Sequence, residues 1–177
     1  SIGTGAEAMS ERKSREVEEF FHKHNCMGPL SAGYGQSEGC SNFTLPNPMF
    51  PLKDGCVGMP MPATVVSIFD PETLEEKGYG EMGEVCVDCP AKMLGYSGYM
   101  GDEMTERTLV KHADGTVWLH TGDIGYITEH GIIHILGRGY SERFGGGHLF
   151  IMRMESRAVE ADGVKDGFFC LMPDQEH

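Results

Sequence analysis

Short segments with the composition of β-strands fill the middle of the 177-residue chain. The clearest are ATVVSIF, GEVCVDC, TVWLHTG and GIIHILG, and the turn sequences DPET, ADG and EHG punctuate them. β-Branched and aromatic residues favour strands, whereas Asp, Gly and Pro favour the tight turns that join neighbouring strands. The stretch from Val57 to Leu136 therefore predicts a small, mostly antiparallel β-barrel or sandwich, interrupted by one helix near residues 102–110.

The segment before this unit mixes helix and strand patterns. SIGTGAEAMS is interpreted as a glycine-rich turn, and Ser10 is placed to cap a helix over SERKSREVEEFFHKH. One apolar stripe on that helix is expected to pack against the rest of the protein, and it comprises Val17, Phe20, Phe21 and His24. A short buried strand is predicted over residues 30–34. TLPNPMF is predicted to be an extended connection, because each proline biases its predecessor away from helix.

The sequence pattern changes again after Gly137. RMESRAVEA predicts a helix and KDGFFCLMP a strand. We therefore expect an α+β fold in three parts: the end of a large α/β layer at residues 1–50, the antiparallel barrel at residues 51–137, and a hinge with an incomplete C-terminal α+β domain at residues 138–177.

Composition restricts the partners and the compartment. The formal net charge of −13 argues against a broad nucleic-acid or anionic-membrane surface, because like charges repel, although a small nucleotide in a local pocket is compatible with it. No apolar run approaches the ~18 residues of a membrane span. The six cysteines are scattered and no signal peptide opens the chain, so we expect reduced thiols in the cytoplasm. Cys86-x-x-Cys89 lacks a second pair at metal spacing, which favours a strand over a zinc site.

The turn Gly33–Glu38, with the sequence GYGQSE, carries several chemical groups in six residues. Its glycines let the backbone approach a ligand, Tyr34 offers an aromatic face, Ser37 offers a hydrogen-bond donor for a phosphate oxygen, and Glu38 offers a hard oxygen ligand for Mg²⁺. Taken alone, the same residues are also compatible with a surface turn that holds a half-buried tyrosine.

Two further groups point to a sugar. Asp123 follows a glycine at the predicted strand end of WLHTGDIG, where its carboxylate can accept both hydroxyls of a ribose. Arg138 lies fifteen residues later, after a strand and its return, so both side chains can reach one ligand. Otherwise the aspartate caps a turn and the arginine is a solvated charge.

In this order the motifs resemble the adenylate-forming superfamily, which includes acyl-CoA synthetases, aryl-CoA ligases, luciferases and the adenylation domains of peptide synthetases. GTGAEAMS resembles the adenine-side loop of that family, and GYGQSEG resembles its tyrosine-glycine-x-threonine-glutamate motif with Ser37 at the threonine position. GEMGEVCVDCPAKMLGY, WLHTGDIGYITEHGIIHILGR and GVKDGFFCLMPDQEH are similar to later family motifs. The resemblance covers nearly the whole chain and favours acyl- or aryl-CoA synthetases over amino-acid adenylation domains.

The resemblance implies a role for each matching residue. Tyr34 would stack on adenine, with Gly35 beside it, Ser37 would contact the α-phosphate and Glu38 would hold Mg²⁺, so that Ser37 and Glu38 are the expected catalytic residues. The remaining assignments place Gly5, Ala6 and Glu7 on the other side of the purine, Asp123 and Arg138 on the ribose hydroxyls, Gly39 and Cys40 near the acyl pocket, and Tyr140 at the hinge.

The family chemistry implies ATP, Mg²⁺ and CoA. A carboxylic acid first attacks the α-phosphate of ATP to give an acyl-adenylate, and a thiol such as CoA then displaces AMP. The segment contains neither the lysine-ending phosphate loop nor the late lysine of the family, so we expect it to be inactive by itself. Tyr140 replaces the usual aspartate or lysine of the hinge, and the glycine run at residues 145–147 is equally compatible with a pantetheine contact or a flexible connector.

Alternatives to the ligase interpretation stay open from the sequence. One is a nucleotide-binding or protein-interaction module without catalysis, and another is a fragment of an amino-acid adenylation domain. Apolar faces around Phe20 and Phe21 and at residues 168–172 are expected to favour self-association. The sequence does not identify the carboxylic acid or the acceptor thiol.

Overall fold

The structure, a computed structural model, describes residues 2–5, 11–45, 49, 55–138, 143–144, 147–148, 150–165, 167 and 169. Its helices are α1 (Glu11–Lys23), α2 (Gly101–Thr108), α3 (Ile151–Ala158) and the 3-10 turn η1 (Ser37–Gly39). Its strands are β1 (Ile2–Thr4), β2 (Leu30–Ala32), β3 (Gly35–Gln36), β4 (Ser41–Asn42), β5 (Thr44–Leu45), β6 (Cys56–Pro60), β7 (Val65–Phe69), β8 (Gly83–Asp88), β9 (Leu109–Lys111), β10 (Val117–Ile127), β11 (Ile133–Arg138), β12 (Arg143–Phe144) and β13 (Gly147–His148). The predicted α+β class is confirmed.

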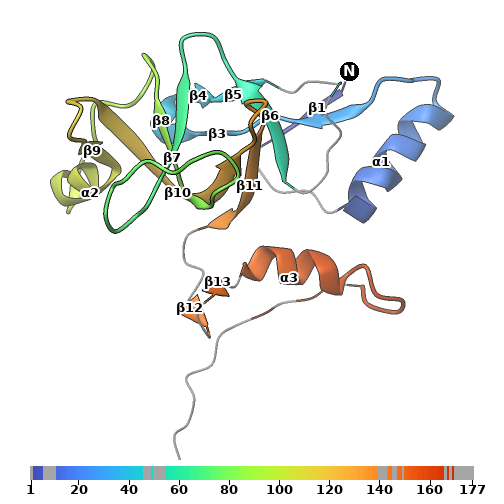
Figure 1. Cartoon of the computed structure of the whole chain (residues 1–177). Coiled ribbons are helices and arrows are strands. Elements are labelled where there is room, and N and C mark those ends of the chain that lie inside the picture. Colours follow the sequence, from blue (N-terminus) through green and yellow to red (C-terminus); the bar gives the residue numbers. More distant parts are fainter. Residues whose placement is uncertain are drawn as a thin grey trace, which may run out of the picture.

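One antiparallel sheet forms the body of the molecule (Figure 1). Its strand order is β5-β6-β11-β10-β8-β7, and β9 adds to β10. All four strand patterns singled out in the sequence fall in this sheet, as β7, β8, β10 and β11. Within the described residues β5 and β7 remain its two edges, so the predicted barrel or sandwich is an open half-barrel.

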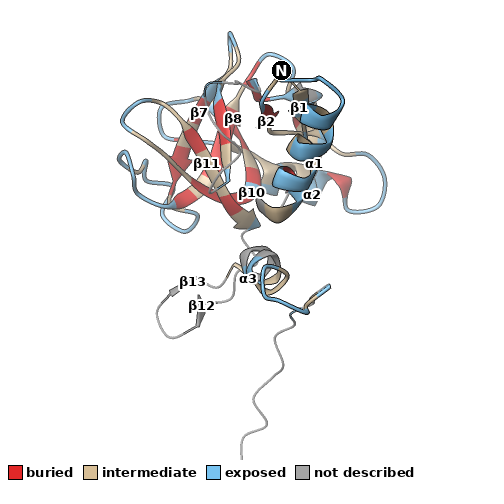
Figure 2. Cartoon of the chain, turned by 90° about the vertical axis from the view of Figure 1, so that its right-hand side faces the viewer, coloured by how far each residue is buried: buried red, intermediate tan, exposed pale blue. Residues whose placement is uncertain are grey.

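The core lies where the central strands are covered on both faces. Val85, Cys86 and Val87 of β8 have no exposed surface, and the same is true of Leu119 in β10. Figure 2 shows the buried segments gathered on β7, β8, β10 and β11. Burying a side chain of this size contributes about 1.5–3 kcal/mol, so this layer is the rigid support on which the neighbouring turns are held.

The first residues form a strand, and the interpretation of SIGTGAEAMS as a turn is wrong for its beginning. β1 pairs in parallel with β2, with Ile2 opposite Leu30 and Thr4 opposite Ala32. The amide of Gly33 then donates to the carbonyl of Thr4 at 2.9 Å. Three residues are too few to show strand alternation in a sequence, and their pairing is supplied by a segment about 28 residues away.

Helix α1 is present as predicted, but only part of its expected apolar stripe packs, because Val17 and Phe21 are half-buried whereas Phe20 and His24 are exposed. Ser14 is buried and Phe20 is 58% exposed. Glu18 accepts a hydrogen bond from the amide of Leu30 at 3.1 Å, which ties the helix to the start of β2. The face of α1 that carries Ser14 and Glu18 therefore packs against the protein. Phe20 instead contacts the rings of its neighbours Phe21 and His24.

The C-terminal segment contains the predicted helix, observed as α3, and the short pair β12–β13. In Figure 1 these elements lie below the sheet, beyond the end of β11. Most of the strand predicted over KDGFFCLMP and the expected hinge residue Tyr140 lie outside the described residues. The boundaries between the three parts stay a prediction. No helix in the described part of the chain is long and apolar enough to cross a membrane.

Candidate functional site

The pairing of β10 with β11 brings Asp123 and Arg138 side by side. The two residues are direct register partners in the antiparallel ladder. The prediction that Asp123 lies at a strand end is wrong, because β10 continues through it to Ile127. The pairing of β10 with β8 is irregular between His120 and Ile124, and Gly122 in this bulge has a φ of 71°. Bulges of this kind re-aim a side chain without ending the strand.

The Asp123 carboxylate is the meeting point of the site. Asp123 is 6% exposed. The hydroxyl of Tyr34 donates to its Oδ2 at 2.6 Å, and the amide of Gln36 donates to the same oxygen at 2.8 Å. Nε of Arg138 lies 3.3 Å from Oδ1. Tyr34 lies 89 positions before Asp123 in the sequence and Arg138 lies 15 positions after it. Both nevertheless reach this one carboxylate, as the sequence analysis predicted.

Tyr34 is held at both ends. Its carbonyl accepts from the amides of Phe43 and Thr44, and its own amide donates to Thr44 Oγ1 at 2.9 Å. The ring meets Phe43 edge to face, with centroids 5.6 Å apart. Burial, and next the nearby Asp123 carboxylate, raise the pKa of Tyr34 well above its ordinary value. The phenol therefore stays protonated and remains a hydrogen-bond donor at neutral pH.

Gln36 is a site residue that the sequence analysis missed. Besides Asp123, its amide nitrogen donates to the carbonyl of Thr121 at 2.9 Å, so one side chain spans both ends of the Thr121–Asp123 bulge. In the tyrosine-glycine-x-threonine-glutamate motif it stands at the unspecified position between Gly35 and Ser37, so the motif gave no reason to select it. Only its contact with a residue 87 positions away identifies it.

Ser37 and Glu38 lie one turn further, in η1. Ser37 is exposed and Glu38 is half-buried. The hydroxyl of Tyr96 donates to Glu38 Oε1 at 2.7 Å, and the amide of Met93 donates to the carbonyl of Glu38 at 2.7 Å. Burial, and then the hydrogen bond with Glu38, raise the pKa of Tyr96. Tyr96 is a second residue missed from the sequence, although it lies in the quoted MLGY motif.

The other residues predicted for the site differ in where the structure places them. Gly5 lies against the turn, since a Cβ built on it would be 3.5 Å from the carbonyl oxygen of Gly33. Gly39 is buried, and a Cβ there would lie 2.0 Å from the ring of Phe43, so this face of Gly39 meets the core. Cys40 is exposed and has a φ of 55°. Ala6 and Glu7 lie outside the described residues.

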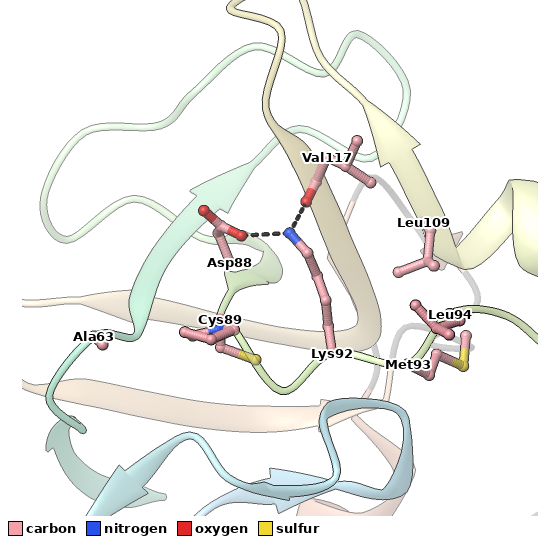
Figure 3. Close-up of a pocket in the computed structure, with 9 residues that line it drawn as sticks. Ala63, Asp88, Cys89, Lys92, Met93, Leu94, Leu109 and Val117 are labelled. Carbon is pink, nitrogen blue, oxygen red and sulfur yellow. Dashed lines mark hydrogen bonds and ion pairs between the residues drawn. The ribbon is translucent and has the colours of Figure 1, made fainter.

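A pocket of about 510 Å³, shown in Figure 3, lies around Lys92, and Asp123 is not among its lining residues. Lys92 bridges it by donating to Asp88 and to the carbonyl of Val117. The pocket adjoins Glu38 through the backbone of Met93. Its lining residues include none of the predicted nucleotide-binding positions, and they are Ala63, Asp88, Cys89, Pro90, Lys92, Met93, Leu94, Leu109 and Val117.

Comparison with protein families identifies a matching family model. Residues 2–97 of the chain match the family model described as AMP-binding enzyme. The matched segment includes β1, the turn at residues 33–38 and Tyr96, which contacts Glu38. It ends before Asp123 and Arg138, so the geometry of those two residues is an observation independent of this match.

Individual proteins extend the likeness over more of the chain. A probable 4-coumarate–CoA ligase of Dictyostelium discoideum is 39% identical over 128 residues, which are 71% of this chain and 22% of that protein. The structure of ATP-bound MatB from Rhodopseudomonas palustris is 28% identical with a TM-score of 0.71, and the match covers 93% of this chain and 30% of that one. An O-succinylbenzoate CoA synthetase of Bacillus subtilis, in complex with ATP and magnesium ion, shares the fold with a TM-score of 0.68 at 24% identity, over 88% of this chain and 30% of that one.

Proposed function

This chain belongs to the AMP-binding enzyme family, and on that premise we propose that it is a segment of an ATP-dependent acid–CoA ligase. The chain spans 22% of the 4-coumarate–CoA ligase and 30% of the ATP-bound MatB that it matches. The proposed whole protein joins a carboxylic acid to a thiol by way of an acyl-adenylate.

One observation carries the proposal: Tyr34, Gln36 and Arg138 converge on the carboxylate of Asp123. Oδ2 already accepts two hydrogen bonds, whereas Oδ1 faces only the arginine at 3.3 Å among the described residues. A carboxylate oxygen has room for a second donor, and a vicinal diol supplies such donors in pairs. We therefore assign Asp123 to the ribose hydroxyls, with Arg138 beside it and the ring of Tyr34 at the adenine.

The phosphate end of the proposed site lies at the other end of the same turn. Ser37 is exposed and can donate its hydroxyl to an α-phosphate oxygen. Glu38 suits Mg²⁺, because the cation prefers hard oxygen ligands and Tyr96 already fixes Oε1. Magnesium would supply charge neutralisation at the phosphates. Gly35 has a backbone that can approach the nucleotide, and Gly5 lies close enough to form a wall of the same space.

The proposed reaction needs positioning more than covalent chemistry from this segment. The acid's carboxylate oxygen attacks the α-phosphorus of ATP, the bond to the β-phosphate bridging oxygen breaks, and pyrophosphate leaves with its electron pair. A thiolate then attacks the acyl carbon, the acyl–phosphate bond breaks, and AMP leaves. Asp123 would hold the ribose and Ser37 the phosphates, which fixes the α-phosphorus relative to the incoming carboxylate. This positioning is the main contribution that the two residues make to the proposed reaction.

The acceptor substrate and the cellular compartment are also proposals. CoA is the proposed acceptor, on the basis of the CoA ligase among the relatives. A reducing cytoplasm is proposed because the five described cysteines form no disulfide with one another. Recovery of the protein from cells in a secreted, disulfide-bonded form would contradict that location. Self-association through Phe20 stays a prediction that light scattering can test.

The test uses the full-length protein that carries this segment. Wild type, Glu38→Gln and the control Glu106→Gln, an exposed glutamate of α2, are supplied with ATP, Mg²⁺ and a panel of carboxylic acids, and pyrophosphate release is measured. We expect turnover with at least one acid and a loss of about 10²-fold in Glu38→Gln alone, because a group that neutralises charge in the transition state is removed. Equal rates for all three proteins would contradict the assignment of Glu38. Binding of AMP without any pyrophosphate release would instead favour a non-catalytic nucleotide-binding module.

A further inference from the structure

A chain of partly buried polar side chains lies behind the bulge that carries Asp123. Glu84 of β8 uses both carboxylate oxygens: Oε1 accepts from the amide of Gly122 at 2.9 Å, and Oε2 lies 2.8 Å from Nδ1 of His120. Nε2 of His120 lies 2.9 Å from Nε2 of His112. The chain therefore runs from the turn between β9 and β10, through β10, to the backbone next to Asp123.

The bulge explains why these side chains are needed. Residues 121–123 leave the regular ladder with β8, so their backbone groups cannot all pair with backbone. Side chains replace the missing bonds: Glu84 binds the Gly122 amide, and Thr121 Oγ1 accepts from the amide of Asp123 at 3.1 Å while donating to the carbonyl of Val85 at 2.6 Å. The direction of the Asp123 carboxylate thus depends on groups that do not touch it.

The surroundings make this chain rigid. The side chains of Glu84 and His120 are 12% and 8% exposed. His112 is buried, and its ring meets Phe69 edge to face with centroids 4.4 Å apart. Two imidazoles and a carboxylate in line cannot rearrange without losing hydrogen bonds, and His112 packs against an apolar ring, although the chain reaches the surface at Gly122.

Hydrogen bonding accounts for this cluster without a cation. Glu84, Cys86 and His120 are close enough to one another to be considered as metal ligands. Both oxygens of Glu84 and both ring nitrogens of His120 already have partners within the protein, however. The arrangement is therefore better described as a support for the Gly122 backbone.

We propose that Glu84, held in place by His120 and His112, is a positioning residue that fixes the Gly122 bulge and so aims Asp123 at its ligand. The proposal rests on the proposed function for the identity of that ligand, a ribose, but not for the positioning itself. If both imidazoles are neutral, the chain has one direction: His120 donates from Nδ1 to Glu84 and accepts at Nε2 from His112.

The test compares Glu84→Ala, Glu84→Gln and the control Glu106→Ala in the 177-residue chain. Three properties are measured: hydrogen exchange at the Gly122 amide, the ring ¹⁵N shifts of His120, and the dissociation constant for AMP. Glu84→Ala is expected to speed exchange at Gly122 by at least about tenfold and to weaken AMP binding about 3- to 10-fold, because one hydrogen bond to the bulge is lost. Glu106→Ala is expected to change neither property.

Glu84→Gln separates positioning from simple loss of structure. Its amide oxygen can still accept from Gly122, so exchange is expected to stay close to wild type. Its amide nitrogen now faces His120 Nδ1, which must accept a hydrogen bond instead of donating one. The ring proton of His120 is therefore expected to move from Nδ1 to Nε2. Gly122 exchange within twofold of wild type in Glu84→Ala would overturn the proposal, and so would AMP binding no weaker than in Glu106→Ala. If the wild type fails to bind AMP, the proposed function fails and the exchange and ¹⁵N results alone decide the positioning role.

Discussion

The hydrogen bond between Tyr34 and Asp123 predicts a measurable coupling between the two side chains. Its 2.6 Å length lies in the range of charge-assisted O–H···O⁻ bonds, and Asp123 is only 6% exposed, so screening by water is small. Such bonds contribute about 1.5–3 kcal/mol to stability. In Tyr34→Phe the carboxylate keeps Gln36 and Arg138, so it is not orphaned, and we expect a loss of about 1.5–3 kcal/mol rather than more.

Asp123→Asn gives the second arm of the cycle. The asparagine keeps an oxygen for the phenol but loses the charge, so Tyr34→Phe in this background removes an uncharged bond of about 0.5–1.5 kcal/mol. The lost ion pair adds little, because the side chain of Arg138 is 64% exposed. The two effects of Tyr34→Phe should therefore differ by about 1 kcal/mol.

Urea unfolding, followed by tryptophan fluorescence, gives the free energy of unfolding of the wild type, the two single variants and the double variant. Trp118 is the single tryptophan and is buried, so its emission reports on the sheet that carries the site. Tyr79→Phe is the matched control, because Tyr79 is 72% exposed and should change stability by less than about 0.5 kcal/mol. The reasoning is refuted if Tyr34→Phe costs no more than Tyr79→Phe, or if its cost is the same with and without the charge on Asp123.

Three further predictions concern other parts of the structure. Gly39→Ala should destabilise the chain by about 1–3 kcal/mol in urea, because the new Cβ would lie 2.0 Å from the buried ring of Phe43. Burial, and then His120, lower the pKa of His112, so below pH ~6.5 the unfolded chain binds more protons than the folded one and stability should fall as the pH falls, by at most about 1.4 kcal/mol per pH unit. His112→Gln should flatten this dependence in urea unfolding between pH 5 and 8. Tyr96→Phe should weaken Mg²⁺-dependent ATP binding about 10- to 100-fold in calorimetry, because Glu38 loses the hydroxyl that orients it.

Each of these has a result that contradicts it. Gly5→Ala is the control for Gly39→Ala, since its Cβ would meet its nearest neighbour at an ordinary 3.5 Å, and equal stability of the two variants would show that Phe43 yields easily. An unchanged pH dependence in His112→Gln would mean that another group titrates. ATP binding by Tyr96→Phe that matches wild type at every Mg²⁺ concentration would remove Tyr96 from the site.

The strand patterns were predictable because their signal is local. β7, β8 and β11 are short runs of β-branched and apolar residues between turn residues, and this composition by itself predicts strands. The extent of β10 was not predictable, because Gly122, Asp123 and Gly125 are poor strand formers. Pairing overrides that preference: a Cβ at Gly125 would lie 2.4 Å from the carbonyl oxygen of His134, so the glycine permits the close approach of β11.

Three members of the candidate site were predictable from the sequence, but their contacts were not. A resemblance of motifs identified Tyr34, Asp123 and Arg138, yet nothing local shows that the phenol donates directly to the carboxylate 89 residues away. Gln36 and Glu84 were missed for the same reason, since each acts through a partner on a different strand. The packed face of α1 was predicted only in part, since Val17 and Phe21 are half-buried but Phe20 is exposed; amphipathic spacing shows a stripe but not the element that will cover it.

The central claim is that Asp123 faces the ribose of a bound adenine nucleotide. Calorimetry of the 177-residue chain with AMP and with 2′,3′-dideoxy-AMP tests it most directly, because the two ligands differ only in the hydroxyls assigned to this carboxylate. We expect the wild type to bind AMP at least about tenfold more tightly than 2′,3′-dideoxy-AMP. The Asp123→Asn variant should lose most of that preference for AMP. Equal affinity of the wild type for the two nucleotides, no binding of either, or full discrimination by Asp123→Asn would contradict the account.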